Sequence, residues 1–203
     1  MTIDGLDTSR YPTVAKYLSQ IGGGLAAHPE CVAKASLLRS ILDDKSLPTV
    51  EGLPPELVEL VLHPPPQTAW VPEVHFRALM RAVFDAHFDA PSRFYEWAYV
   101  SQKKLLEGPL YRILFFMVSP ERVAHTATSR WEKFHRGIGL SAKVGHGQLR
   151  AVLTHPPFVA DAFDHHATLE GVRAALELAG AKAVTTSVED VTSTRGVFGF
   201  TWR

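Results

Sequence analysis

The sequence has a single cysteine, no excess charge of either sign and no long hydrophobic run. Because Cys31 has no second cysteine to pair with, the chain cannot hold an intrachain disulfide, which fits a reducing cytoplasm. Its 21 Lys and Arg balance 21 Asp and Glu, so the basic excess of a dedicated nucleic-acid-binding protein is absent. The longest apolar run, residues 113–118, falls far short of the ~20 residues that span a membrane. Composition therefore predicts a globular, cytoplasmic protein that binds no nucleic acid and crosses no membrane.

Signatures of catalysis are equally scarce. No serine lies in a G-x-S-x-G elbow, and no pair of carboxylates has an obvious acid–base spacing. The glycines at 22–24 lack the Lys-Ser/Thr that completes a phosphate-binding loop. Cys31 lies near a predicted helix start, which favours a thiolate, but it has no identifiable partner base, and a buried, inert thiol is the plainer interpretation. We therefore expect no enzymatic activity.

Histidine, by contrast, is abundant, with ten residues in the chain. Asp161 and His165 are four residues apart and would share a helical face, as metal ligands must, whereas the adjacent His166 would point elsewhere. We interpret this segment, which also contains Asp164, as a solvated helix start. Metal ligation there stays open as an alternative, as does haem ligation by a histidine in residues 125–135.

Proline and glycine divide the first two-thirds of the chain into short amphipathic segments. Apolar residues recur at three- and four-residue spacing within each one, which is typical of helices with one buried face. The predicted helices cover residues 14–21, 29–47, 55–62, 72–87, 92–106 and 120–136. Residues 110–117 are almost wholly apolar, and we expect them in the centre of the core.

After Gly137 the spacing of apolar residues changes from about 3.6 to 2. Residues 138–144 and 149–153 alternate around a Gly-His-Gly turn, which predicts a β-hairpin. A predicted helix over 169–179 and two further strands follow, over 183–188 and 197–202. The predicted fold class is α+β, with an N-terminal helical part packed on a C-terminal four-stranded antiparallel sheet that one helix crosses.

The same pattern suggests how the chain is organised. We expect residues 1–32 to form an N-terminal extension and residues 33–203 to form a single α+β domain. Within that domain, residues 33–136 are predicted to be helical and residues 137–203 to contain the sheet.

Three stretches of sequence resemble a known family. They are residues 35–42 together with 69–72, residues 119–131, and residues 169–184 together with 198–202. They resemble an uncharacterised family abundant in myxobacteria, over about residues 33–203. That family is similar to 4-vinyl-reductase-like and haem nitric-oxide-binding domains, in which a small-molecule pocket lies between a helical part and an antiparallel sheet. The resemblance implies a sensory or ligand-binding role and carries no catalytic residues.

Two departures from those relatives leave the cofactor unknown. The haem-binding relatives hold the haem carboxylates with a Tyr-x-Ser-x-Arg motif, which Tyr111-Arg112-Ile113 does not match. Vinyl-reductase-like domains often carry a cysteine in the last hairpin, where this sequence has none at residues 192–195. Both departures argue against haem or zinc chemistry.

A set of aromatic residues is the best remaining indication of a site. We expect it to line a pocket for a small hydrophobic ligand between helices and sheet, although an ordinary aromatic core would have the same composition. Arg112 is isolated in an apolar segment, so we expect it to be buried and to meet a carboxylate of the protein or of the ligand. The candidate pocket residues are Trp97, Arg112, Phe115, Phe116, Trp131, Phe198, Phe200 and Trp202.

A protein-interaction or assembly module without a small-molecule ligand is the alternative. Trp70 follows a run of three prolines and is the aromatic anchor that such a surface would use. Homodimerisation also stays open, because related domains often pair, although the sequence shows no heptad repeat.

Overall fold

The computed structural model describes residues 4–115 and 118–203, which form two compact units. The first unit contains residues up to Phe94 together with 134–137, and the second contains residues 95–133 and 138–203. Helices and antiparallel sheets occur together, so the predicted α+β class is confirmed. The sequence predicts an extension over residues 1–32 and a single domain over residues 33–203. That division describes which parts fold independently, so it stays a prediction.

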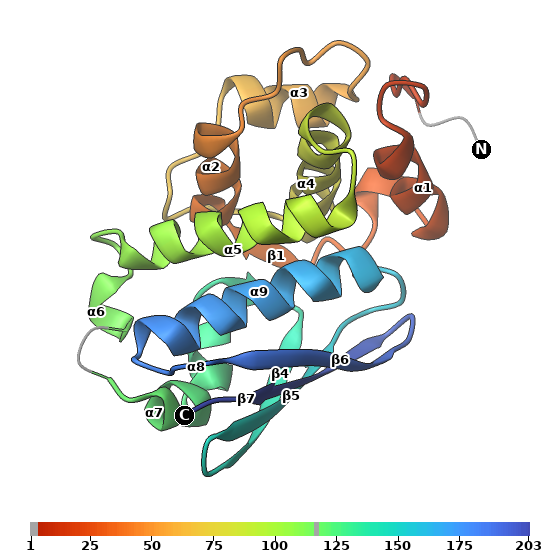
Figure 1. The fold of residues 1–203 in the computed structure, drawn as a ribbon. Coiled ribbons are helices and arrows are strands. Elements are labelled where there is room, and N and C mark those ends of the chain that lie inside the picture. The colour runs from red at the N-terminus through yellow and green to blue at the C-terminus, as the bar shows by residue number, and fades with distance from the viewer. Residues whose placement is uncertain (1–3, 116–117) are drawn as a thin grey trace. The chain divides into compact units, whose positions relative to one another are not determined.

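The first unit is mainly helical (Figure 1). The amphipathic faces predicted from the sequence are buried here, with Val14, Tyr17 and Leu18 of α1 packed against α4. The Asp85 carboxylate on α4 binds the start of α1, because it accepts hydrogen bonds from the backbone N–H and the hydroxyl of Thr13. The helices of this unit are α1 (Pro12–Gln20), a short 3-10 turn (Gly24–Ala26), α2 (Ala35–Asp44), α3 (Pro55–Leu62) and α4 (Glu73–His87).

A small sheet of three short strands completes this unit, in the order β2-β1-β3. β1 (Val32–Lys34) pairs antiparallel with both β2 (Trp70–Pro72) and β3 (His135–Arg136). The prediction that a helix begins at residue 29 is therefore wrong, since α2 starts only after β1. The helix predicted to have Pro72 at its first position starts one residue later, at Glu73, directly after β2. Strands of two or three residues are too short to show a period of 2, so the sequence pattern could not separate them from the following helices.

A buried ionic cluster joins α4 to this sheet. Glu73, the first residue of α4, is completely buried, and its carboxylate contacts the Arg77 guanidinium at 2.7 Å and the His135 ring of β3 at 3.0 Å. Its backbone N–H donates to the carbonyl of Cys31, next to β1. A guanidinium, an imidazole and a helix N-terminus thus surround one buried carboxylate, and such partners offset the cost of removing it from water.

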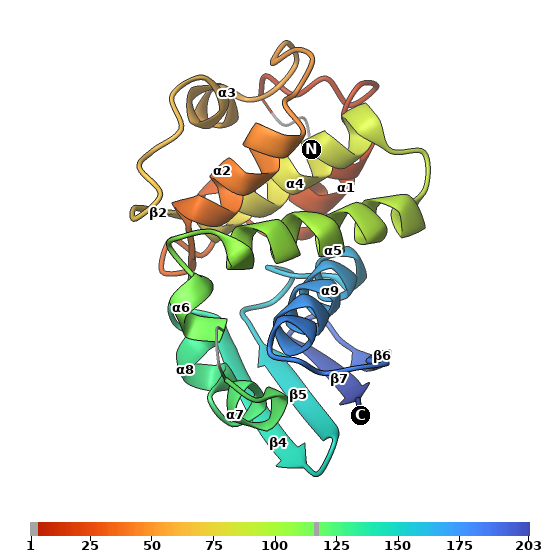
Figure 2. The same cartoon turned by 60° about the vertical axis from the view of Figure 1, so that its left-hand side comes forward.

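The second unit contains a four-stranded antiparallel sheet in the order β4-β5-β7-β6. The predicted hairpin is confirmed, because residues 139–145 pair with 148–154 around a turn at residues 146–147. The predicted crossing helix is also present: α9 lies along one face of the sheet against β6 and β7 (Figures 1 and 2). The strands are β4 (Gly139–Gly145), β5 (Gln148–Thr154), β6 (Thr185–Val191) and β7 (Arg195–Thr201).

Helices supply the rest of this unit. α5 begins at the end of the first unit, and α7 and α8 pack against β4. Thr126 divides the single helix predicted over 120–136 into α7 and α8. None of the described helices has the length and hydropathy needed to cross a bilayer. The helices are α5 (Pro91–Glu107), α6 (Arg112–Phe115), α7 (Pro120–His125), α8 (Ala127–Trp131) and α9 (Ala162–Leu178).

The described side chains of the predicted apolar core segment, those of residues 110–113, do not form the centre of the core. Leu110 is 44% exposed and Ile113 is 82% exposed, and the side chain of Arg112 between them is also exposed. Tyr111 is the buried residue of this stretch. The prediction of a buried Arg112 is therefore wrong: α6 has only four residues, which is about one turn, and one turn cannot bury all of its sides.

Helix α9 begins earlier than predicted, at Ala162. Asp161 is its N-cap and accepts the backbone N–H groups of Phe163 and Asp164, while the Asp164 carboxylate accepts the N–H of Asp161. This reciprocal capping box explains the acidic residues of the segment. The segment is a helix start, as predicted, but Asp164 and His165 are buried rather than solvated.

Breaking the ionic cluster should destabilise the protein strongly. We expect Arg77→Met to lower the free energy of unfolding by about 3–5 kcal/mol, because it leaves the Glu73 carboxylate buried with one cation fewer. Urea unfolding followed by circular dichroism measures this loss. The double variant Glu73→Gln/Arg77→Met removes both charges and should recover part of it; an equal loss in the single and double variants would contradict this account.

The thiol of Cys31 should be unreactive in the folded protein. Cys31 is fully buried, and burial together with the negative charges of Glu30 and Glu73 raises its pKa to about 11. The thiol is therefore protonated at pH 8, whereas the reactive form is the thiolate. We expect no reaction with Ellman's reagent at pH 8 until urea unfolds the chain. Rapid labelling of the native protein would contradict this prediction.

Candidate functional site

The aromatic residues proposed as a pocket all belong to the second unit, but their exposure differs. Phe198 and Phe200 on β7 are almost completely buried, with exposed fractions of 0% and 1%. Trp97 on α5 and Trp131 on α8 are half-buried. The β7 aromatics therefore serve as core, whereas the two tryptophans keep part of each ring accessible.

Hydrogen bonds fix the orientation of two of the indoles. Trp131 donates from Nε1 to the carbonyl of Ile138 at 2.9 Å, and Trp202 donates from Nε1 to the Glu121 carboxylate at 3.1 Å. The backbone N–H of Glu121 itself, together with the bond from Trp202, lowers the pKa of the Glu121 carboxyl. Buried or half-buried indoles usually find such partners, so these contacts define rigid ring positions around the end of the sheet.

The other sequence-predicted pocket residues are less informative. Arg112 is exposed on α6. Phe115 ends that helix, but its side chain lies outside the described part of the structure, as does the whole of Phe116. Their role in ligand binding stays a prediction.

Trp70, the expected partner-binding residue, lies on β2 of the first unit with its ring between two cations. The Lys34 ammonium and the Arg136 guanidinium each lie 4.1 Å from the ring centroid. All three side chains come from neighbouring strands of the small sheet and are at least partly exposed. Cation–π contacts of this kind hold an aromatic ring at the surface in one orientation.

The buried histidines pair with other protein groups. Nδ1 of His155 lies 2.9 Å from the carbonyl oxygen of Pro156 and must donate to it, so Nε2 of His155 accepts from Nε2–H of His165 at 3.4 Å. The His165 ring also lies against Phe198 and directly above Gly196. This geometry fixes the imidazoles as part of the core that α9 forms with the sheet.

The residues that the structure describes do not fit haem or a metal centre. No group of three or more His, Cys, Asp or Glu side chains comes together among them as metal ligands would. The exposed Arg112 provides no counterpart to the buried arginine of a haem-carboxylate motif. His135, the buried histidine in the segment considered for haem, is bound to Glu73 through Nδ1.

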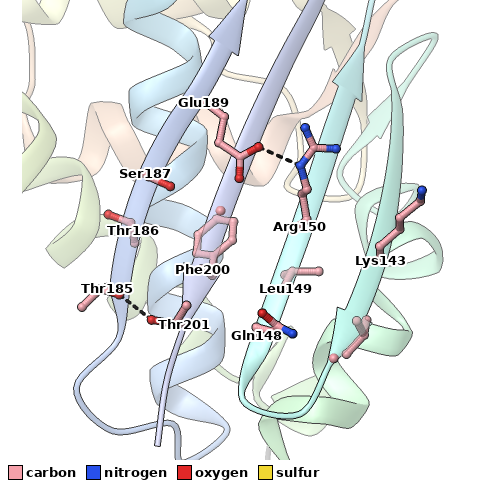
Figure 3. Close-up of a pocket in the computed structure, with 13 residues that line it drawn as sticks. Lys143, Gln148, Leu149, Arg150, Thr185, Thr186, Ser187, Glu189, Phe200 and Thr201 are labelled. Atoms are coloured by element: carbon pink, nitrogen blue, oxygen red, sulfur yellow. Dashed lines mark hydrogen bonds and ion pairs between the residues drawn. The ribbon is translucent and has the colours of Figure 1, made fainter.

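Sequence reasoning missed a trough on the face of the sheet opposite α9. It has a cavity volume of about 470 Å³, within the range of small-molecule sites. Figure 3 shows polar side chains from all four strands around it. The exposed lining side chains are Lys143, Gln148, Arg150, Thr185, Ser187, Glu189 and Thr201.

Gly199 in the middle of β7 forms the floor of this trough. A Cβ atom there would lie 2.7 Å from Oγ of Ser187 and 2.8 Å from Oε1 of Glu189. Because Gly199 leaves this space open, Glu189 on β6 can reach across β7 to Arg150 on β5, with Nε and Oε2 2.7 Å apart. The available signal in the sequence was an interior strand glycine, which often marks close approach of another group.

The comparisons with known proteins establish a fold likeness without a family. No protein-family model matches the sequence, and no curated protein matches it. Among solved structures, the chain is similar to an oxygen-binding H-NOX domain related to soluble guanylate cyclases. The TM-score is 0.52 and the sequence identity is 9%, and the match covers 83% of this chain and 92% of that chain. It is also similar to an iron(II) unliganded H-NOX protein variant from K. algicida, with a TM-score of 0.52 and 12% identity over 84% and 96% of the two chains.

A third similar structure was described for modulating haem redox potential through porphyrin distortion. It has a TM-score of 0.51 and 9% identity, over 93% of this chain and 96% of that chain. The likeness to H-NOX domains predicted from the sequence resemblance is thus supported at the level of the fold. The chain shares the H-NOX-like arrangement of helices and antiparallel sheet.

Proposed function

We propose that this protein is a non-enzymatic, ligand-binding domain with a sensory or regulatory role. The observation that carries the proposal is the H-NOX-like fold, because the similar solved structures include an oxygen-binding domain and together cover most of this chain. A shared fold is an argument by analogy, so the role has to be tested on this chain's own residues. The single buried thiol is compatible with a cytoplasmic location, which we also propose.

The ligand that we propose is a small hydrophobic molecule bound against the aromatic residues of the second unit. Trp97 and Trp131 are the residues most suited to contact it, because both rings are partly accessible. The hydrogen bond from Trp131 to Ile138 pre-orients its ring, which reduces the entropy lost on binding. Phe115, Phe116, Phe198, Phe200 and Trp202 would complete the apolar surroundings, with Arg112 at the exposed edge.

The test is native mass spectrometry of the full chain purified from cells, compared with its denatured mass. We expect extra non-covalent mass on the native protein, and lower occupancy in Trp131→Leu. Trp70→Leu is the matched control, because it removes an equally large, half-buried indole from the other unit. Native wild-type protein with no extra mass, or an equal loss in both variants, would contradict the proposal.

A protein-interaction or assembly role is the alternative, and the cation-flanked ring of Trp70 is the observation that favours it. An aromatic ring held between Lys34 and Arg136 presents two positive charges beside an apolar surface. Such a surface suits an acidic partner or a second copy of the chain. Under this alternative the native protein carries no ligand, and Trp70→Leu lowers its oligomeric mass.

A further inference from the structure

We propose that the trough on the outer face of the four-stranded sheet is a binding site for a small phosphorylated polyol. The phosphate would lie between Lys143 and Arg150, and its hydroxyl groups would face the Thr, Ser and Gln side chains. This site is separate from the proposed hydrophobic site, because its exposed lining side chains lie on the opposite face of the sheet from buried Phe198, which packs against His165 of α9. The two proposals can therefore fail independently.

Two positively charged side chains, one on β4 and one on β5, lie side by side where a bound anion would stabilise them. Lys143 and Arg150 are directly opposite each other in the register of these two strands, and both side chains are exposed. Like charges in this position destabilise a sheet, and a bound anion would relieve the repulsion. Lys143 makes no ion pair with any carboxylate in the described part of the chain, so its charge is available to a ligand.

Glu189 holds the Arg150 side chain in position to bind an anion. The register between β6 and β7 shifts between Val188 and Asp190, and Glu189 is the extra residue of that irregularity. Strand irregularities of this kind redirect a side chain, and here the carboxylate lies above Gly199 and binds Nε of Arg150. The terminal guanidinium nitrogens are left for a ligand, and a guanidinium already held in place loses less entropy on binding a phosphate.

The remaining lining side chains determine the rest of the ligand. Thr185 and Thr201 share a hydrogen bond between their hydroxyls at 2.6 Å, and Ser187 and Gln148 lie near them (Figure 3). Hydroxyls and an amide both donate and accept hydrogen bonds, so they suit the hydroxyl groups of a polyol. Phe200 and Leu149, the large apolar residues of the lining, have buried side chains, so the trough offers no aromatic surface for a base or a flat ring.

The charge balance favours phosphate over a carboxylate. Lys143 and Arg150 contribute two positive charges and Glu189 one negative charge, which leaves the trough with an excess of one. A phosphate monoester carries close to two negative charges and three acceptor oxygens at neutral pH, so it can engage the ammonium and the guanidinium together. A carboxylate has two acceptor oxygens and one charge, and would engage only one of the two cations well.

The experiment is isothermal titration calorimetry of the full chain with glucose 6-phosphate at low ionic strength. Glucose, gluconate and inorganic phosphate are titrated in parallel. We expect glucose 6-phosphate to bind most tightly, inorganic phosphate more weakly and glucose not at all. Failure of glucose 6-phosphate to bind would overturn the proposal, and tighter binding of gluconate would overturn the assignment of phosphate.

Variants distinguish the trough from non-specific charge binding. Lys143→Gln and Arg150→Gln should each weaken glucose 6-phosphate binding about tenfold to a hundredfold, as expected for the loss of a charge-assisted hydrogen bond. Arg195→Gln is the matched control, because Arg195 is an exposed, ion-paired arginine of the same sheet outside the trough. Equal weakening in this control would overturn the proposal.

A glycine substitution tests the shape of the trough without changing charge. In Gly199→Ala the new methyl group meets only the ends of the Ser187 and Glu189 side chains, which are free to shift. We expect the folded structure to be retained, as checked by circular dichroism, and the binding of glucose 6-phosphate to fall with the lost space. Unchanged binding in the folded variant would contradict a ligand seated above Gly199.

Discussion

The first unit depends on the contacts of one buried carboxylate. Glu73 begins α4, and its contacts reach Arg77 one turn later, the backbone beside β1 and the ring of His135 on β3. These contacts fix the start of the longest helix in the unit relative to both the central strand and one edge strand of the small sheet. Without such contacts, strands of two or three residues would have too few backbone hydrogen bonds to define their own register.

The close packing around this carboxylate extends to Cys31 and Gly137. The thiol of Cys31 donates to the carbonyl of Gly137, and a Cβ atom at Gly137 would lie 2.8 Å from the carbonyl oxygen of Glu30. Gly137 also has a positive φ of 76°, a conformation that side chains disfavour. The prediction that a helix ends at Gly137 is wrong, because α8 already ends at Trp131 and β3 immediately precedes the glycine. The glycine is required by this close approach instead.

Sequence periodicity predicted the long elements well and the short ones poorly. The hairpin of β4 and β5, the last strand and α5 each contain enough residues for their period to be visible. The strands of the small sheet do not, and their partners lie about 40 and about 100 residues away in sequence, so no local pattern records the pairing. For residues 110–113, the described side chains of the segment 110–117, the expected burial was wrong because a very apolar segment was assumed to be buried, whereas a short helix exposes part of its surface.

The aromatic site and the trough also differ in how far the sequence could predict them. The aromatic residues could be named from composition, but the sequence could not separate Phe198 and Phe200, which are core, from the accessible rings of Trp97 and Trp131. The trough could not be predicted at all, since it arises from the register of four strands and from one irregularity in β6. Gly199 alone among the trough residues carries a signal in the sequence, as a glycine inside a strand.

The interrupted path of the chain has a consequence during protein synthesis. The first unit takes its last strand from residues 134–137, after residues 95–133 have gone to the second unit. A ribosome therefore releases β1, β2 and most of the helices of this unit well before β3 exists. Until then one edge of β1 is open, with its hydrogen-bonding groups available to another nascent chain. The brevity of β1 limits this risk, because three residues offer little surface for mispairing.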